Sequence, residues 1–244
     1  MKPRTTIASV PTPDGGTLVL EEHDGDYYVR LGGAILMSTR STLSERFLAE
    51  VVARRLSGMT SASVLIGGLG FGFTTRELLE RTDQRVRVEV AELFDEVIEW
   101  NRQYLGAQNK GVLEHSRVRV HHQDVWDAMG RPGEGGAYDA ILLDVDNGAS
   151  ALVQERNGRL YSLRGLHRIA SSLNDRGYLA VWSANPDPAF NRRLQHAGFS
   201  VEEIPVRAHE RARRSAHVVY LGRKTKAVGS AQKEKTEGKR GRRA

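Results

Sequence analysis

The chain has 244 residues, with 36 Lys and Arg against 30 Asp and Glu, a formal net charge of +6, and no cysteine. This length suits one α/β domain with a small extension, and the lack of cysteine excludes disulfides, thiolate metal sites and cysteine nucleophiles. No apolar run reaches the roughly 18–20 residues that a bilayer-spanning helix needs, and Met1 opens a polar segment without the hydrophobic stretch of a signal peptide. We therefore expect a cytoplasmic protein without a membrane partner.

The excess of positive charge lies at the C-terminus. Residues 223–244 hold nine of the basic residues and two of the acidic ones, which leaves 27 basic and 28 acidic residues in 1–222. Because this tail has almost no apolar residues, we expect it to be disordered and to make at most weak contacts with nucleic acid or other polyanions. Specific nucleic-acid binding is not expected.

The N-terminal part, residues 1–40, is predicted to form a small β unit. Three β-rich runs are Thr17–Glu21, Tyr27–Leu31 and Ala34–Met37; the first connection contains Asp and Gly, and the second is Gly32-Gly33. The next segment, Thr42–Leu56, spaces its apolar residues as one side of a helix, which Ser41 or Thr42 can cap. We place the domain boundaries at 1–40, 41–222 and 223–244.

Beyond residue 62, apolar runs alternate with amphipathic segments. The runs that predict strands are Val64–Ile66, Val86–Val90, Val118–Val120, Ala140–Leu143 and Tyr178–Trp182. The segments that predict helices are Thr74–Arg81, Phe94–Leu105, Val125–Met129 and Ser162–Leu173. This alternation predicts an α/β fold with a doubly wound, mostly parallel, Rossmann-like sheet. The last two runs, Ser200–Val206 and Ala216–Leu221, are expected to form an antiparallel hairpin at the sheet edge.

A glycine cluster follows the first strand of this region. Gly67, Gly68, Gly70 and Gly72 lie between the run that ends at Ile66 and the next predicted helix. Glycine permits positive φ and close approach of a ligand, and the first N–H groups of a helix are free to bind one. A glycine turn also joins a strand to a helix for packing alone, so this motif by itself is weak evidence for a binding site.

Acidic residues follow the next three strands. Glu92 lies 22 residues beyond Gly70, a spacing typical of a carboxylate that accepts hydrogen bonds from ribose hydroxyls. Asp124, after the third strand, can accept from an exocyclic amine such as that of adenine, while Val125 packs on the ring. Asp144 follows the fourth strand directly. Each acid alone also fits a structural role, as a helix-start charge, an N-cap or a turn residue, but together they predict a nucleoside site.

The charge of this site indicates which nucleoside it binds. A P-loop lysine motif is absent from the sequence, and a row of carboxylates repels a pyrophosphate but suits a sulfonium cation. We therefore expect S-adenosylmethionine or a relative, and not NAD.

Several segments together resemble the spermidine synthase (polyamine aminopropyltransferase) family, whose catalytic domain has the class I methyltransferase fold. The resemblance covers about 63–183 and rests on VLIGGLGFGFTTRELLE, VEVAELFDEVIEW, RVRVHHQDVWDAM, YDAILLDVDNG and RLYSLRGLHRIASSLNDRGYLAVWS. It implies an aminopropyl transfer from decarboxylated S-adenosylmethionine to a small amine, in an enzyme that assembles as a homo-oligomer, commonly a dimer or a tetramer.

The resemblance also assigns roles to the residues of the expected site. It implies that Glu92 holds the ribose, that Asp124 and Val125 hold the adenine, and that Asp144 orients and deprotonates the attacking amine. Proton transfer to Asp144 is chemically sensible, because an amine that attacks a carbon next to a sulfonium must lose a proton. The same geometry serves methyl transfer, because only the attacked carbon changes.

The acceptor side matches the family pattern less closely. Where the family has an aspartate in the glycine loop, this sequence has Phe71. Where the family has the second aspartate of its D-x-x-D pair, this sequence has Asn147, with Asp146 beside it. We assign Asp146 and Asn147 to substrate binding. Tyr161, which matches an aromatic-Ser pair of the family, either lines the substrate site or packs in the core.

Two further features are interpreted structurally. His115, His121 and His122 lack the spacing of metal ligands, because adjacent strand residues face opposite sides, so no metal is expected. Asn185–Pro188 is predicted to be a turn. Three functions stay open: aminopropyl transfer, S-adenosylmethionine-dependent methyl transfer to a small nucleophile, and nucleoside binding without catalysis.

Overall fold

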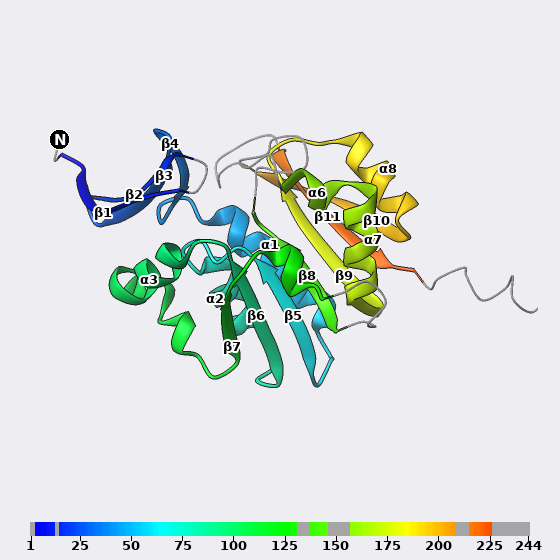
Figure 1. Ribbon diagram of the computed structural model, residues 1–244. Helices are drawn as coiled ribbons and strands as arrows, with labels where there is room; N and C mark the ends of the chain where they lie inside the picture. The colour runs from blue at the N-terminus through cyan, green and yellow to red at the C-terminus, as the bar shows by residue number, and fades with distance from the viewer. Residues whose placement is uncertain (1–2, 13–14, 131–136, 146–156, 208–214, 226–244) are drawn as a thin grey trace, which may run out of the picture.

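Two β-sheets organise the described part of the chain (Figure 1). The computed structural model describes residues 3–12, 15–130, 137–145, 157–207 and 215–225. The smaller sheet has four strands and the larger one seven. Among the helices of these residues, none combines the length and the apolar character that crossing a membrane requires.

The four-stranded sheet is formed by the N-terminal residues, in the order β1-β2-β3-β4 with every neighbouring pair antiparallel. Its strands are β1 (Thr5–Pro11), β2 (Thr17–His23), β3 (Asp26–Leu31) and β4 (Ala34–Ser38). The last three correspond to the three expected runs. The sequence did not predict β1, because this edge strand is largely exposed and lacks the alternation of apolar and polar residues that indicates a strand.

The seven-stranded sheet has the order β10-β11-β9-β8-β5-β6-β7. Its strands are β5 (Ala62–Gly67), β6 (Val86–Glu92), β7 (Val118–His122), β8 (Tyr138–Leu143), β9 (Leu173–Ser183), β10 (Phe199–Arg207) and β11 (Ser215–Lys224). Strands β5 to β9 are parallel, and β11 pairs antiparallel with both β9 and β10. The predicted doubly wound sheet with an antiparallel hairpin at its edge is confirmed.

The helices connect these strands as the alternation predicts. They are α1 (Leu43–Leu56), α2 (Phe73–Arg81), α3 (Asp95–Tyr104), α4 (Gly106–Asn109), α5 (Val125–Ala128), α6 (Gly158–Tyr161), α7 (Leu163–Ser172), α8 (Pro188–His196) and the 3₁₀ helix η1 (Val112–Glu114). We did not predict α8, because Asn185–Pro188 reads as a turn. The turn instead opens a helix: the Asp187 carboxylate accepts from the backbone N–H of Ala189 and of Phe190, at 2.9 and 3.0 Å.

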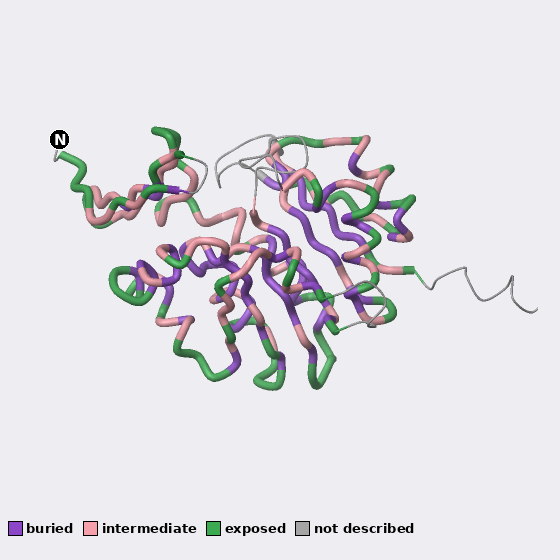
Figure 2. Tube along the Cα trace, viewed as in Figure 1, coloured by how far each residue is buried: buried purple, intermediate pink, exposed green. Residues whose placement is uncertain are grey.

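Each face of the larger sheet packs on its own hydrophobic cluster. On one face, Val64 and Ile66 of β5 pack in a cluster with side chains of α1 and α2. On the other face, Leu65 belongs to a cluster that contains Leu166 of α7 and Phe190 of α8. Buried residues accordingly follow the central strands (Figure 2). The alternation of side chains along β5 thus produces a sheet covered on both faces.

A third cluster holds the small sheet against the larger unit. Leu18 and Val29 of the small sheet pack with Phe71 and Phe73, which follow β5, and with Trp100 of α3. The small sheet is therefore fixed near the carboxyl ends of β5 and β6. The domain boundaries that we placed at residues 40 and 222 stay predictions; the last strand of the large sheet continues two residues beyond the second of them.

Candidate functional site

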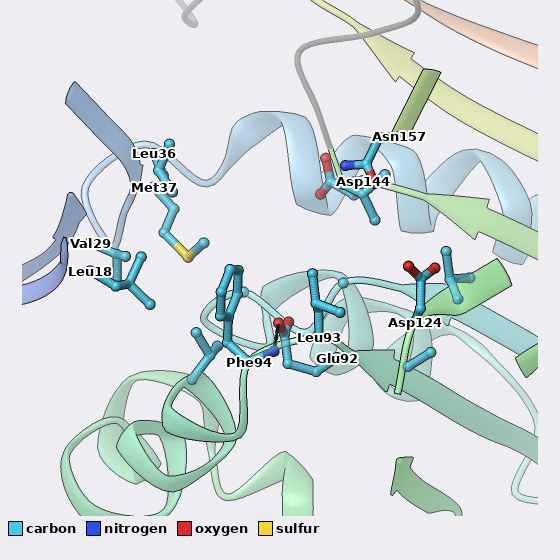
Figure 3. Close-up of a pocket in the computed structure, with 16 residues that line it drawn as sticks. Leu18, Val29, Leu36, Met37, Glu92, Leu93, Phe94, Asp124, Asp144 and Asn157 are labelled. Carbon is cyan, nitrogen blue, oxygen red and sulfur yellow. Dashed lines mark hydrogen bonds between the residues drawn. The ribbon is translucent and has the colours of Figure 1, made fainter. Parts of the chain in front are cut away.

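A cavity lies at the carboxyl ends of the parallel strands (Figure 3). The carboxylates of Glu92, Asp124 and Asp144 line it; Glu92 is the last residue of β6, and Asp124 and Asp144 follow β7 and β8. The small sheet contributes the opposite wall, with Leu36 and Met37 among its lining residues. Since β5 lies where the strand order reverses, this first cavity occupies the position at which open α/β sheets bind ligands.

The glycine turn that follows β5 forms the floor of this cavity. Gly68 has φ +86°, and a Cβ there would lie 3.2 Å from the backbone oxygen of Asp144. Gly70 also lines the cavity. Gly72, by contrast, lines neither this cavity nor the one described below; it has φ +80° at the start of α2, and a Cβ there would meet Val112 at 2.8 Å. Gly68 and Gly70 are therefore at the site, whereas Gly72 is required for packing.

Two buried asparagines hold the turn in place. The Nδ2 group of Asn101 donates to the carbonyl of Gly70 at 2.8 Å. Asn109 donates through Nδ2 to the carbonyl of Phe71 at 3.3 Å and to Oδ1 of Asn101 at 2.8 Å. Both asparagines are 1% exposed or less, so the bonds are shielded from water. Helices α3 and α4 thus fix the carbonyl groups of the glycine turn.

Glu92 ties the end of β6 to the same turn. One carboxylate oxygen accepts from the N–H of Leu69 at 2.8 Å, and the other accepts from the N–H of Phe94 at 2.9 Å. Burial raises the pKa of Glu92, while the backbone N–H groups of Phe94 and Leu69 lower it. The carboxylate therefore links the end of β6 to the glycine turn, and it is also a hydrogen-bond acceptor on the cavity wall.

Asp124 is likewise engaged by its neighbours. One oxygen caps α5 by accepting from the N–H of Trp126 at 2.9 Å, and the other accepts from Nη2 of Arg159 at 2.6 Å. The Arg159 guanidinium also lies over the Trp126 ring, 4.9 Å from its centre. Val125, beside Asp124, is buried and lines the cavity. These contacts fix the orientation of the Asp124 carboxylate.

A second cavity, of about 310 Å³, adjoins the first. The two share lining residues that include Met37, Gly68, Gly70 and Asp144. A cavity that holds a single water has a volume of only roughly 10–15 Å³ on the same measure, so the second cavity is large enough for an organic molecule. Its wall includes Glu45, from the first turn of α1.

Asp144 lies at the junction of the two cavities. Burial, and to a smaller extent the nearby Glu45 carboxylate, raise the pKa of Asp144 to about 7. A hydrogen bond from Thr74 lowers this pKa and so partly opposes the two effects. That bond joins Oγ1 of Thr74 to Oδ2 of Asp144 at 3.3 Å. Burial also raises the pKa of Glu45, while a hydrogen bond from Ser44 lowers it. Two acids in one cavity with raised pKa values are typical of proton-transfer sites.

The remaining expected residues are distributed as follows. Asp146 and Asn147 lie outside the described residues, so their role in substrate binding stays a prediction. Tyr161 is 3% exposed, and its ring contacts Phe190 edge to face with the ring centres 5.7 Å apart. It packs in the core cluster below the sheet and is not among the described residues that line either cavity.

Several contributors to the site were not predicted from the sequence. They include Glu45 of α1, the asparagines Asn101 and Asn109 of α3 and α4, and Arg159 of α6. The only local signal was the position of Glu45 in the pattern T-L-S-E, which usually indicates a helix-capping box. In the structure, Thr42 occupies the N-cap without a side-chain capping bond, so the expected cap is absent there.

Comparison with known proteins gives relatives for part of the chain. No family model matches it. Polyamine aminopropyltransferases from Pyrobaculum islandicum and Pyrobaculum calidifontis are 25% and 28% identical to it over 123 residues. Those residues are 50% of this chain and 41% of each relative, so the match spans less than half the length of these transferases.

Solved structures match over most of the chain. A spermidine synthase in complex with the transition state analogue AdoDATO has a TM-score of 0.64 at 18% identity, covering 89% of this chain and 71% of that one. The spermidine synthase from Thermotoga maritima has a TM-score of 0.65 at 18% identity, covering 89% and 72%. A probable spermidine synthase from Corynebacterium glutamicum has a TM-score of 0.62 at 13% identity, covering 91% and 81%. The expected resemblance is confirmed. Across 50% of its length the chain is similar in sequence to polyamine aminopropyltransferases, and its methyltransferase-like fold is that of the spermidine synthases.

Proposed function

We propose that this protein transfers the aminopropyl group of decarboxylated S-adenosylmethionine to an amine. The observation that carries the proposal is the junction of two cavities at Asp144. One cavity suits a nucleoside and the other an acceptor, and a group transfer requires both reactants to meet at one point. The names of the sequence relatives and of the similar structures support the same reaction.

The first cavity fits the donor by charge and by hydrogen bonding. Glu92 has lone pairs left to accept from ribose hydroxyls, and Asp124 and Val125 are placed to take an adenine amine and ring. No lysine or arginine is among the described residues that line either cavity. A pyrophosphate would find no counter-charge there, whereas a sulfonium cation meets carboxylates.

The proposed reaction needs one base. The amine nitrogen attacks the methylene carbon bound to sulfur, forming a C–N bond, while the C–S bond breaks and its electron pair stays on sulfur. Methylthioadenosine leaves as a neutral thioether, and the proton lost by the nitrogen passes to Asp144. A carboxylate with a pKa of about 7 is an efficient acceptor near neutral pH, because it is substantially ionised and still basic.

Methyl transfer from S-adenosylmethionine is the second candidate. It is favoured by Phe71, which lines the second cavity with an apolar ring at the position where the family resemblance implies an aspartate. An apolar wall leaves the end of the donor chain without that carboxylate, so it weakens the case for an aminopropyl group. The two reactions differ in the donor and in the nucleoside product.

Product analysis separates the candidates. The purified chain is incubated with decarboxylated S-adenosylmethionine or with S-adenosylmethionine, together with a panel of small amines, and the nucleoside products are identified by mass spectrometry. We expect methylthioadenosine and an aminopropylated amine from the decarboxylated donor alone. Formation of S-adenosylhomocysteine would support methyl transfer. Tight binding of methylthioadenosine without turnover of any amine would indicate a nucleoside-binding protein.

A further inference from the structure

A third cavity, of about 460 Å³, lies between α5 and α7. It shares no described lining residue with the two cavities at the strand ends. The proposed reaction uses none of the residues that line it. They are Trp126 of α5 together with Leu163, Arg164, His167, Arg168 and Ser171 of α7.

The charge of this third cavity is of one sign. Arg164 and Arg168 are four residues apart and therefore lie on one face of α7, with His167 beside them. Helix α7 contains no acidic residue, and neither arginine takes part in an ion pair with the described residues. Asp127, the residue after Trp126, is exposed and is not among the described lining residues. The cavity therefore attracts anions.

The indole of Trp126 gives the cavity a flat apolar wall. The Arg168 guanidinium lies over this ring, 4.8 Å from its centre. Its Nε atom donates to the carbonyl of Trp126 at 3.1 Å, while its Nη groups have no partner among the described residues. Leu163, which is 43% exposed, adds a second apolar side chain. A held cation beside a ring and a leucine suits a molecule that joins an anion to an apolar ring.

We propose that the third cavity binds a small phosphate ester that carries a flat ring, such as a nucleoside monophosphate. The phosphate pairs with Arg164 and with the Nη groups of Arg168, and the ring packs on Trp126 and Leu163. A phosphate ester has three terminal oxygens and a charge of about −1.5 to −2, so it can pair with two guanidinium groups. A carboxylate, with two oxygens and one charge, matches a single guanidinium. This site goes beyond the proposed function and does not depend on it.

The dimensions of the cavity favour a free molecule over a phosphate carried by a protein. A volume of about 460 Å³ is of the order found for small-molecule sites. Only α5 and α7 contribute described lining residues, whereas a stable protein interface buries roughly 800 Å² on each partner. The shared chemistry of both sources is an aromatic or heterocyclic ring joined to a phosphate.

The first test titrates the full chain with phenyl phosphate, followed by calorimetry and by tryptophan fluorescence. Inorganic phosphate lacks the ring, and benzoate replaces the phosphate by a carboxylate. We expect one equivalent of phenyl phosphate to bind at least about fivefold more tightly than either compound and to change the fluorescence. Trp126→Phe should bind phenyl phosphate without that change, because Trp100 and Trp182 are not among the described lining residues.

Three variants at exposed positions separate the contributions of charge and of apolar contact. Arg164→Gln should weaken the binding of phenyl phosphate about tenfold, because it removes a charge-assisted hydrogen bond. Leu163→Ala should weaken phenyl phosphate but change the affinity for inorganic phosphate by less than about twofold. Arg192→Gln, at an exposed arginine of α8 that is not among the described lining residues of the three cavities, is the matched control and should bind phenyl phosphate normally.

Competition shows whether the third cavity is a separate site. Saturation with methylthioadenosine should leave phenyl phosphate bound, because the cavities share no described lining residue. Displacement of phenyl phosphate, equal affinity for inorganic phosphate, or full affinity in Arg164→Gln would each overturn the proposal. Failure of aminopropyl transfer would leave it intact, since none of these measurements requires turnover.

A final comparison distinguishes the two sources of the phosphate. It uses uridine 5′-monophosphate, whose base lacks the exocyclic amine expected beside Asp124, and the amide of N-acetyl-phosphotyrosine. Tighter binding of the nucleotide, lost in Arg164→Gln, supports the proposal. Tighter binding of the phosphotyrosine compound would assign the cavity to a phosphorylated protein and overturn the assignment to a free molecule.

Discussion

The two cavities hold their carboxylates in different ways. In the first, Glu92 accepts two backbone N–H groups, and Asp124 accepts one backbone N–H and one guanidinium. In the second, Asp144 accepts from the hydroxyl of Thr74 and Glu45 from that of Ser44, and burial raises the pKa of both carboxylates, as it does the pKa of Glu92. Glu92 and Asp124 are therefore each fixed by two donors, whereas Asp144, which lines both cavities, accepts one hydroxyl hydrogen bond and has a pKa of about 7.

This difference matches two separate tasks. A carboxylate whose oxygens are already held by hydrogen bonds presents its remaining lone pairs in a fixed direction, which suits recognition of a rigid nucleoside. A carboxylate that few groups stabilise gains and loses a proton easily near neutral pH, which suits acid–base work. Substitutions in the two cavities should consequently affect different measured quantities.

The largest effect is expected at the junction. Asp144→Asn removes the proposed proton acceptor and keeps the size of the side chain, so kcat should fall by about 10²–10⁴ while donor affinity changes little. Steady-state kinetics and calorimetry with methylthioadenosine measure the two quantities. Asp175→Asn, on an exposed residue of β9, is the control. Full turnover by Asp144→Asn would mean that another group accepts the proton.

The pH dependence of stability sharpens the same contrast. The folded chain holds the proton of Asp144 up to a pKa of about 7, whereas the unfolded chain releases it near the ordinary value of 3.8. The contribution of this group to stability is therefore lost as pH rises between those values. The Asp144→Asn variant lacks this loss. We therefore expect the free energy of unfolding of the variant, relative to that of the original chain, to rise by about 2 kcal/mol from about pH 5 to about pH 8.

Urea denaturation at the two pH values measures that difference. Asp175→Asn, at an exposed residue of β9, is measured alongside as the control variant. If the gap between Asp144→Asn and the original chain were the same at both pH values, the raised pKa of Asp144 would be contradicted.

A smaller effect on stability is expected in the first cavity. Glu92→Gln replaces one accepting oxygen by an NH₂ group, which leaves the N–H of Leu69 or of Phe94 unsatisfied and should reduce the free energy of unfolding by about 1–2 kcal/mol. Affinity for methylthioadenosine should fall at the same time. Glu89→Gln, three residues earlier on β6 and 40% exposed in its side chain, is the control. Unchanged nucleoside affinity in Glu92→Gln would remove Glu92 from the donor site.

Much of the fold and half of the site followed from local patterns. The glycine turn and the acids Glu92, Asp124 and Asp144 were predicted because each follows an apolar run, and the ends of parallel strands meet at one edge. The orientation of Tyr161 was left open, since an aromatic residue near a site also suits the core. The edge strand β1 and the helix α8 were missed, because their patterns are weak or resemble a turn.

The other half of the site depends on tertiary contacts. Asn101 and Arg159 reach the glycine turn and Asp124 across 31 and 35 residues of sequence, which no short pattern records. Glu45 was missed for a different reason. The pattern T-L-S-E fits a capping box, so a local role accounts for Glu45 without indicating that it lies in a cavity wall. The sequence therefore predicts the site residues that lie at strand ends, but not those that lie on helices distant in sequence from the residues they contact.

The wall that the small sheet gives to both cavities has a consequence for how such proteins diversify. Leu36 and Met37 of β4 line both spaces, yet they belong to a strand that carries none of the acidic groups. Exchange of these side chains would reshape the room for a guest while the charged edge of the larger sheet stays intact. New preferences among bound molecules can therefore arise through mutations in β4, while the acidic residues at the opposite side are preserved.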